Sequence, residues 1–224
     1  MLHCMSPRLW IVILSLFGPV LPHLRAAVAA DPELTVRMYV VAPVPLEMAD
    51  WAAVEATKVL RPLPAQFNFV NCSAEVHPDV CETWDLPTDI RVRFLPKILP
   101  PATPKALGMA MWSDSGGSAA IFYSQAIALR GLQLFPAQVL GRTMAHEIVH
   151  LLLGTPAHVE SGLMRREWTT DDLRMGGRVP MELTSAQRQV IQTAIQLRVA
   201  GAEGIARREQ LGLAAKPKIQ GEPR

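Results

Sequence analysis

The sequence predicts a small α+β protein with a single folded domain. Segments rich in β-branched and aromatic residues fill much of the first half of the chain, as is typical of strands. Two long segments with helical spacing, 136–153 and 184–201, dominate the second half. Of the 224 residues, about 194 remain once an N-terminal leader of 30 is set aside, which is enough for one domain with its own core.

Residues 1–30 have the three-part pattern of a secretory signal. Arg8 and no acidic residue precede the apolar run LWIVILSLFGPVL, and RAAVAAD then offers small residues in an A-x-A pattern. The run is shorter than the roughly 20 residues that a membrane span needs. We therefore expect cleavage after Ala29 or Ala30 and export to the periplasm, the cell surface or the medium. The alternative is an uncleaved membrane anchor, with residues 10–24 as a short span.

The mature chain is expected to be almost neutral. The whole chain has 22 Lys+Arg, and the leader contains two of them, Arg8 and Arg25, so 20 remain against 20 Asp+Glu. A neutral chain without a basic cluster lacks the electrostatic footprint of a nucleic-acid-binding protein. We expect no nucleic-acid partner, no stable membrane span after leader cleavage, and a monomer.

Two cysteines remain after the leader takes Cys4 away. Cys72 and Cys81 lie close together in NCSAEVHPDVC, and such a pair in an exported protein predicts a disulfide. Closing this short loop would contribute about 2–3 kcal/mol to stability. The alternative is two free thiols. His77 lies inside the loop, where we expect it to be solvated.

The first predicted elements alternate between strand and helix. TVRMYVVA (35–42) is apolar and β-branched and predicts a strand, and PLEMADWAAVEATKVL (45–60) has near-helical spacing of its apolar residues. AQFNFVNC (65–72) predicts a strand that runs into the disulfide loop. DIRVRFLP (89–96) alternates apolar residues with arginines, which predicts a strand with one wet face.

The middle of the chain contains more breaks. LPPATPKALG is proline-rich and predicts irregular structure, SDSGGS predicts a turn, and AAIFYS (119–124) a short strand. A long helix follows at 136–153. It has Pro136 in its first turn and Gly154 just past its end, which is the favoured arrangement of these two residues.

The C-terminal part predicts two more helices. TTDDLRM is a short capped helix, because Thr169 lies three residues before Asp172. TSAQRQVIQTAIQLRVAG (184–201) is a terminal helix with one apolar stripe. Residues 203–224 are charged and punctuated by Pro and Gly, so they are expected to form a disordered tail after a domain at 31–202.

The long helix ends in a pattern that predicts a metal site. His146 and His150 are four residues apart, so both rings leave one helix face, and two imidazoles can then bind one Zn²⁺. Glu147 lies on the adjoining face, where it can accept a proton from a metal-bound water, as in other H-E-x-x-H motifs. The alternative is a helix whose histidines form hydrogen bonds in the core.

A catalytic zinc needs a third protein ligand and one open position. Gly154 ends the helix and allows a sharp turn, Pro156 stiffens it, and His158 follows four residues after the glycine. We therefore expect His158 to be the third ligand. The competing ligands are Glu160, Glu167 and Asp171.

HEIVHLLLGTPAH followed by SGLM resembles the metzincin clan of zinc metallopeptidases. Their signature is H-E-x-x-H-x-x-G-x-x-H with a methionine-containing turn beyond it. The stretch is also similar to a group of exported bacterial proteins that carry HExxHLLLG…H…GIM. The matching residues are His146, His150 and His158 as metal ligands, Glu147 as catalytic base, Gly154 as the glycine, and Met164 as the Met-turn methionine.

The chain departs from this signature by one extra residue before the glycine and one more after it. A longer loop costs little entropy, so the third histidine can still reach the metal. Met164 also lies closer to the last histidine than in many metzincins, and an ordinary core methionine is its alternative. No tyrosine follows Met164 to stabilise an oxyanion. Arg165 and Arg166 could contribute there, or could simply be solvated.

The resemblance implies a metzincin-like fold, namely a twisted mixed sheet with an edge strand above the active-site helix and a C-terminal helix. AAIFYS is the candidate for that edge, to which an extended peptide could add as a further strand. An interior strand is the alternative.

Two functions follow from these residues. The first is a secreted zinc-dependent endopeptidase, in which Glu147 deprotonates the water that attacks the peptide bond and passes the proton to the leaving amine. The alternative is a catalytically inactive, zinc-stabilised binding or scaffold domain. A metal-free helical domain is a third reading, but it leaves the position of His158 unexplained.

Overall fold

A five-stranded mixed sheet forms one layer of the protein in the computed structural model, which describes residues 30–41, 43–73, 79–82, 86–113, 116–129, 135–174 and 181–211. Its strands are β1 (Glu33–Val40), β2 (Gln66–Asn71), β3 (Asp89–Leu95), β4 (Gly108–Ser113) and β5 (Gly116–Phe122). They lie in the order β2-β1-β3-β5-β4, and all neighbours are parallel except β4, which is antiparallel to β5. The predicted α+β class is therefore confirmed.

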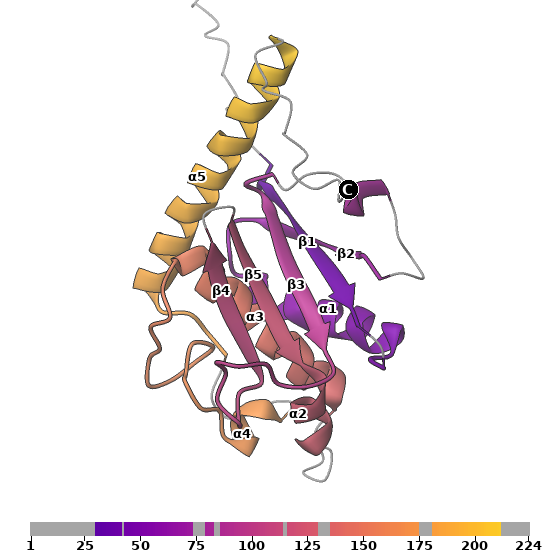
Figure 1. Cartoon of the computed structure of the whole chain (residues 1–224). Helices are drawn as coiled ribbons and strands as arrows, with labels where there is room; N and C mark the ends of the chain where they lie inside the picture. The colour runs from indigo at the N-terminus through magenta and orange to yellow at the C-terminus, as the bar shows by residue number, and fades with distance from the viewer. Residues whose placement is uncertain are drawn as a thin grey trace, which may run out of the picture. The chain divides into compact units, whose positions relative to one another are not determined.

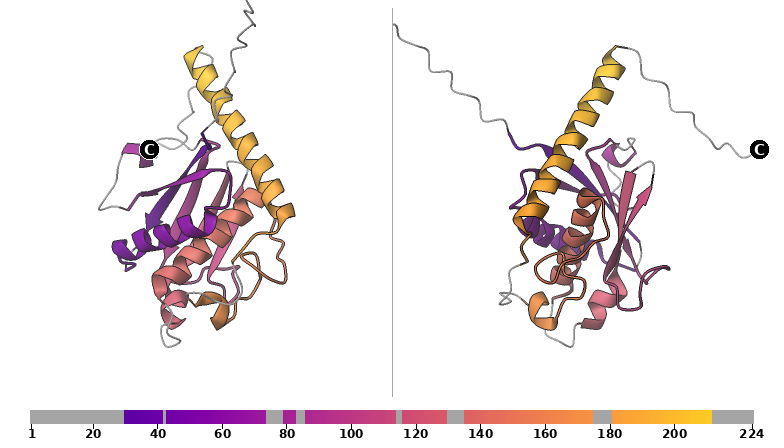
Figure 2. Two further views of the ribbon diagram at one scale, coloured as in Figure 1. Left: turned by 180° about the vertical axis from the view of Figure 1, so that it is seen from behind. Right: turned by 90° about the vertical axis from the view of Figure 1, so that its left-hand side faces the viewer.

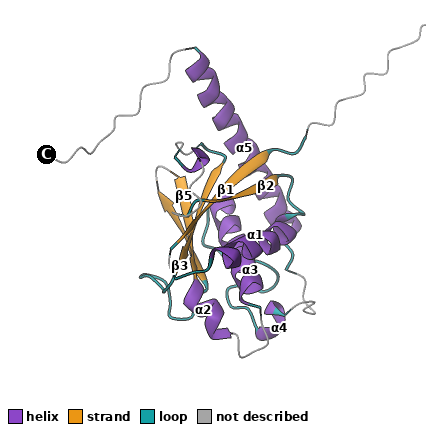
Figure 3. Cartoon of the chain, turned by 90° about the vertical axis from the view of Figure 1, so that its right-hand side faces the viewer, coloured by secondary structure: helices purple, strands orange, loops and turns teal. Residues whose placement is uncertain are grey.

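Two helices form the second layer. The helices of the chain are α1 (Leu46–Leu60), α2 (Tyr123–Ala128), α3 (Pro136–Leu153), α4 (Thr170–Leu173) and α5 (Ser185–Gln210), with a 3-10 turn at Asp79–Cys81. Figures 1 and 2 show α1 and α3 side by side on one face of the sheet, and Figure 3 shows the two layers nearly edge-on. Among the described helices, none is long and apolar enough to cross a membrane.

The core lies between these layers. Alternation in β3 places Ile90, Val92 and Phe94 on the helix side, where all three are buried. Because parallel strands are paired in register, Val36 of β1 and Ile121 of β5 add to the same apolar surface. The buried alanines of α1 and the apolar face of α3 cover it.

The long helix begins and ends where the sequence predicts. Pro136 occupies its first turn, and Gly154 adopts the left-handed conformation (φ 65°) while its N–H donates to the His150 carbonyl. The short helix α4 has the expected capping box, in which Thr169 and Asp172 exchange hydrogen bonds. Both predictions rest on local signals of one or two residues.

The prediction that AAIFYS forms the edge strand is wrong. AAIFYS was expected at 119–124 and at the edge of the sheet, but β5 runs from Gly116 to Phe122 and lies between β3 and β4. The edge is β4, within GMAMWS, which was not predicted as a strand. Its sequence has no β-branched residue, and its pairing with Gly116 and Gly117 of the supposed turn makes it a strand.

The predicted end of the C-terminal helix also differs from the structure. It continues to Gln210 rather than ending near 201, so residues 203–210 are helical and not part of a tail. The segment AEGIARREQ consists mostly of strong helix formers, and one glycine costs only about 1 kcal/mol. The rest of the predicted tail, residues 212–224, lies outside the described residues.

The disulfide is confirmed: Cys72 and Cys81 are bonded, with their Cα atoms 5.7 Å apart. His77 lies outside the described residues, and so does the predicted leader apart from Ala30. The leader, its cleavage and the domain boundaries stay predictions.

The contact between α1 and α3 depends on one glycine. A Cβ at Gly141 would overlap the Ala52 carbonyl oxygen and lie 2.6 Å from Cβ of Glu55. The absence of a side chain therefore allows α3 to lie directly against α1. At Gly204 in α5, by contrast, an added Cβ would have no heavy atom of another part of the chain within 4 Å.

We expect Gly141→Ala to lower the free energy of unfolding by about 1–3 kcal/mol, because the added methyl overpacks the α1–α3 contact. Gly204→Ala should instead raise it by roughly 0.5–1 kcal/mol, since only helix propensity changes there. Urea unfolding of the two variants and the parent measures both changes. Equal stability of Gly141→Ala and the parent would contradict the close helix contact.

Candidate metal centre

Helix α3 presents two histidines to the same point. His146 and His150 are one turn apart and both are buried. The Nε2 atoms of the two rings are 3.0 Å apart. A helix packed against both α1 and the sheet has little freedom to move, so the positions of these two nitrogens are set by its packing.

The third histidine joins them from the loop after the helix. Nε2 of His158 lies 3.2 Å from Nε2 of His150, and ligand atoms of all three histidines lie within 4.8 Å of one another. His146, His150 and His158 thus form a group that could hold a metal ion. Glu160, Glu167 and Asp171, which the sequence left open as ligands, are not part of this group.

The longer spacing of the motif does not prevent this convergence. Gly154 turns the chain away from the helix axis with its positive φ. The next turn is held by Thr155, whose hydroxyl accepts a hydrogen bond from the Ala157 N–H at 3.2 Å. Of the two extra residues, the one before Gly154 lies in α3, which extends to Leu153, and the one after it lies in this turn, so that His158 returns to the end of the helix.

Backbone carbonyls determine which ring nitrogens can bind a metal. Nδ1 of His146 donates to the Leu163 carbonyl at 2.7 Å, and Nδ1 of His150 donates to the Thr155 carbonyl at 2.9 Å. A carbonyl oxygen can only accept, so each Nδ1 carries the proton and each Nε2 of the neutral ring has its lone pair free.

This donor set fits Zn²⁺. Tetrahedral bonds of about 2.0–2.1 Å place neighbouring ligand nitrogens roughly 3.3 Å apart, close to the 3.0 and 3.2 Å seen here. Two neutral acceptor nitrogens at such distances repel each other unless a cation or a proton lies between them. Imidazole nitrogen is a preferred zinc ligand, and three such ligands leave one position open.

Burial keeps the histidines in the neutral form that binds metal. It lowers the pKa of His146 to about 3, although the Leu163 carbonyl opposes this shift. Burial also lowers the pKa values of His150 and His158. For His158 the charge of Arg166 lowers the pKa further, while the Pro156 carbonyl acts in the opposite direction. At neutral pH all three rings are therefore free of a competing proton.

Glu147 lies on the adjoining face of α3, against the edge strand. Its carboxylate accepts a hydrogen bond from the Ala110 N–H of β4. A Cβ at Gly108 would lie 2.9 Å from both Cγ and Oε1 of Glu147, so the glycine makes room for this side chain. Burial raises the pKa of Glu147 to about 8, and the hydrogen bond from Ala110 partly opposes this shift. A carboxyl group with such a pKa can accept and release a proton near neutral pH.

Met164 is fully buried in the core, in the segment that supports the histidines. Its neighbour Leu163 supplies the carbonyl that orients His146, and its own carbonyl accepts from the Val159 N–H at 2.9 Å. These contacts are compatible with a Met-turn and with an ordinary core methionine. The Met-turn role stays a prediction.

The sequence did not point to Trp168. Its ring packs edge-on against His146, with the centroids 5.3 Å apart, and its indole N–H donates to the Leu163 carbonyl at 3.3 Å. The two carbonyls that orient the imidazoles carried no sequence signal at all, because every residue has one.

The two arginines after Met164 differ from each other. Arg165 forms an ion pair with Asp172 at 3.0 Å, so it is not simply solvated. Arg166 is exposed, and its charge acts on His158.

No protein-family model matches the chain, and neither does any curated protein sequence. Among solved structures it is similar to a zinc-dependent peptidase from Methanocorpusculum labreanum, at 12% identity and a TM-score of 0.49, over 70% of this chain and 99% of the other. It is also similar to an archaemetzincin from Methanopyrus kandleri, at 12% identity and a TM-score of 0.40, over 73% of this chain and 96% of the other.

The raised pKa of Glu147 predicts a pH-dependent stability of the metal-free protein. Its pKa of about 8 in the folded protein lies above its ordinary value of 4.5. The favourable contribution of the neutral acid is therefore complete below pH 4.5 and is lost as the pH rises through about 8. Glu147→Gln should match the parent near pH 4.5 and exceed its stability above pH 8, by on the order of a few kcal/mol.

Thermal unfolding of both metal-free proteins between pH 4.5 and 9 measures this difference. The histidines titrate in parent and variant alike, so their opposite effect cancels in the comparison. A difference in stability that does not change with pH would show that Glu147 is not held in a desolvated site.

Proposed function

We propose that this protein is an exported zinc-dependent endopeptidase. His146, His150 and His158 would hold the metal, and Glu147 would transfer the proton. The observation that carries this proposal is the convergence of three imidazole nitrogens beside a buried carboxyl group of the same helix. A purely structural zinc site has no use for such an acid next to its ligands.

Zinc, when bound, would act as a Lewis acid that activates water and polarises the scissile carbonyl. The imidazoles of His146 and His150 are oriented for this role by the carbonyls of Leu163 and Thr155. With three protein ligands, one position stays open for water or substrate, which is the arrangement of catalytic rather than structural zinc sites.

Glu147 would perform the proton transfers. A carboxylate oxygen of Glu147 takes a proton from the water that attacks the carbonyl carbon, and the carboxyl group then gives that proton to the nitrogen of the leaving amine. The raised pKa of Glu147 in the metal-free protein makes its carboxylate a stronger base for the first step, and the Ala110 N–H holds the carboxylate in one orientation. One residue can therefore act as base and then as acid.

The edge strand β4 offers a way to hold a peptide. It pairs with β5 on one side, and no described strand pairs with its other side. An extended peptide could bind there through main-chain hydrogen bonds, beside Glu147, which contacts the same strand. Met111 and Trp112 of β4 are partly exposed and could contact apolar side chains of the substrate. The substrate class is accordingly an extended peptide or an unfolded protein segment.

The metal site predicts the zinc content of the mature chain. Residues 31–224 should bind about one zinc per molecule, and His158→Ala should weaken binding by roughly 100-fold or more because a ligand is lost. Elemental analysis and competition with a chromophoric chelator measure both quantities. His77→Ala is the matched control, because His77 is the fourth histidine of this part of the chain. Unchanged zinc affinity in His158→Ala would rule out the three-histidine site.

The proposed role of Glu147 predicts loss of turnover without loss of metal. Glu147→Gln should lower kcat/KM on a quenched fluorescent peptide library by roughly 10²–10⁴-fold, while zinc content stays near one. The exposed Glu167→Gln is the control and should keep full activity. If the zinc-loaded parent cleaves no peptide, the alternative of a zinc-stabilised binding or scaffold domain is favoured instead.

A further inference from the structure

The third histidine is held less directly than the other two. His146 and His150 project from a buried helix, and a backbone carbonyl orients each ring. Nδ1 of His158 is buried but makes no well-formed hydrogen bond to the described residues. The position of this ring therefore depends on the backbone on both sides of it, namely the turn held by Thr155 and the segment from Val159 to Arg165.

That segment is closed on itself by short backbone contacts. The Val159 N–H donates to the Met164 carbonyl at 2.9 Å. This contact places His158 next to Leu163 and Met164, and the Leu163 carbonyl orients His146. Val159 and Arg165 form an isolated bridge. Leu163 and Met164 of the segment are buried in the core, and Arg165 connects the end of the segment to α4, because its guanidinium donates to Asp172 at 3.0 Å.

Asp172 is well placed to receive this contact. Its side chain is only 8% exposed, and the same carboxylate oxygen accepts from the Thr169 N–H at 2.7 Å and from the Thr169 hydroxyl at 2.8 Å. It belongs to α4, a helix of four residues. Such a short helix has no independent stability, so another element must hold it in place.

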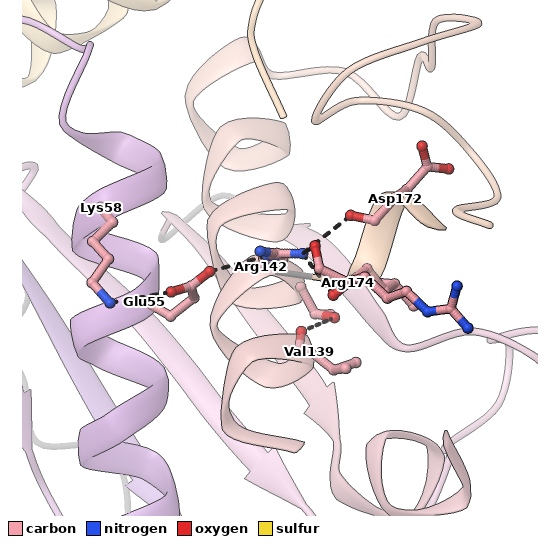
Figure 4. A network of polar contacts seen from close by, with 8 residues as sticks. Glu55, Lys58, Val139, Arg142, Asp172 and Arg174 are labelled. Atoms are coloured by element: carbon pink, nitrogen blue, oxygen red, sulfur yellow. Dashed lines mark hydrogen bonds and ion pairs between the residues drawn. The ribbon is translucent and has the colours of Figure 1, made fainter. Parts of the chain in front are cut away.

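Arg142 supplies that support from the active-site helix. Its Nη1 donates to the carbonyls of Asp172, Leu173 and Arg174 at 3.1, 2.7 and 3.3 Å, and its Nε pairs with Glu55 of α1 at 3.0 Å (Figure 4). Only 11% of each of the Arg142 and Glu55 side chains is exposed. Arg142 lies four residues before His146, so it projects from the same side of α3.

We propose that Arg142, Asp172 and Arg165 are positioning residues for His158. They form a relay, that is, a chain of hydrogen bonds that runs from α3 through α4 to the segment following His158. This chain connects the two parts of the metal site. This proposal rests on the proposed zinc site. It adds that the zinc affinity of the site depends on charged groups that do not touch the metal.

The test compares Arg165→Met with Arg174→Met. Both variants remove one arginine beside α4. Arg174, however, uses its side chain for a surface pair with Asp171 (51% and 78% exposed), and only its backbone meets Arg142. Zinc affinity is measured by chelator competition, and Co²⁺ absorption reports the coordination geometry. The thermal stability of each metal-free variant reports the fold.

Arg165→Met should lower zinc affinity by roughly 10–100-fold and change the Co²⁺ spectrum, as is typical of residues that orient a metal ligand. Removal of a positive charge beside a cation site would by itself raise affinity, so charge cannot produce this loss. Arg174→Met should bind zinc like the parent. Arg165→Lys, which keeps the charge opposite Asp172, should recover part of the affinity. Arg142→Lys should also lose affinity, because lysine cannot bond Glu55 and the carbonyls of α4 together.

A double-mutant cycle separates positioning from general damage. In a His158→Ala background, Arg165→Met should have almost no further effect on zinc affinity, because the remaining ligands lie on the helix. An equal loss in both backgrounds, or no loss with His158 present, would overturn the relay while the zinc site stands. Unchanged affinity in His158→Ala itself would instead refute the zinc site on which the relay rests.

Discussion

The burial of α3 against both α1, its neighbour in the helix layer, and the sheet is the constraint on which the rest of the site depends. Gly141 lets the two helices approach each other at backbone distance, and the core residues of the sheet fill the other side. A helix held in this way cannot rotate or slide, so His146, Glu147 and His150 keep fixed directions. The imidazoles then face the C-terminal loops, and the carboxyl group faces β4.

The same burial controls the charges of the site. Desolvation disfavours every ionised form, so it lowers the pKa of His146 and raises that of Glu147. The histidines become neutral ligands, and the glutamate becomes a group that exchanges a proton near neutral pH. One physical effect therefore suits the histidines and the glutamate alike to the roles proposed for them, and the charge of Arg166 adds to it at His158.

The site combines two histidines on a packed helix with a third, His158, on a loop whose position needs further contacts. Helix packing and two backbone carbonyls position His146 and His150, whereas His158 comes from the loop after the helix. In the proposed arrangement, Arg142 donates to the Asp172 backbone carbonyl and Arg165 forms an ion pair with the Asp172 carboxylate, which together constrain this loop. Partly buried ion pairs in such a place contribute more to a unique geometry than to stability.

Local signals in the sequence determined the two ends of α3, the capping box of α4, the disulfide and the three histidines with their glutamate, because each depends on residues a few positions apart. The tertiary structure decided what depends on distant pairing. Strand β4 exists because β5 pairs with it, and α5 is longer than its glycines suggested. The carbonyls that orient His146 and His150, the contact of Glu147 with Ala110, and the relay to His158 follow only from the fold, since a sequence does not reveal which backbone groups will meet.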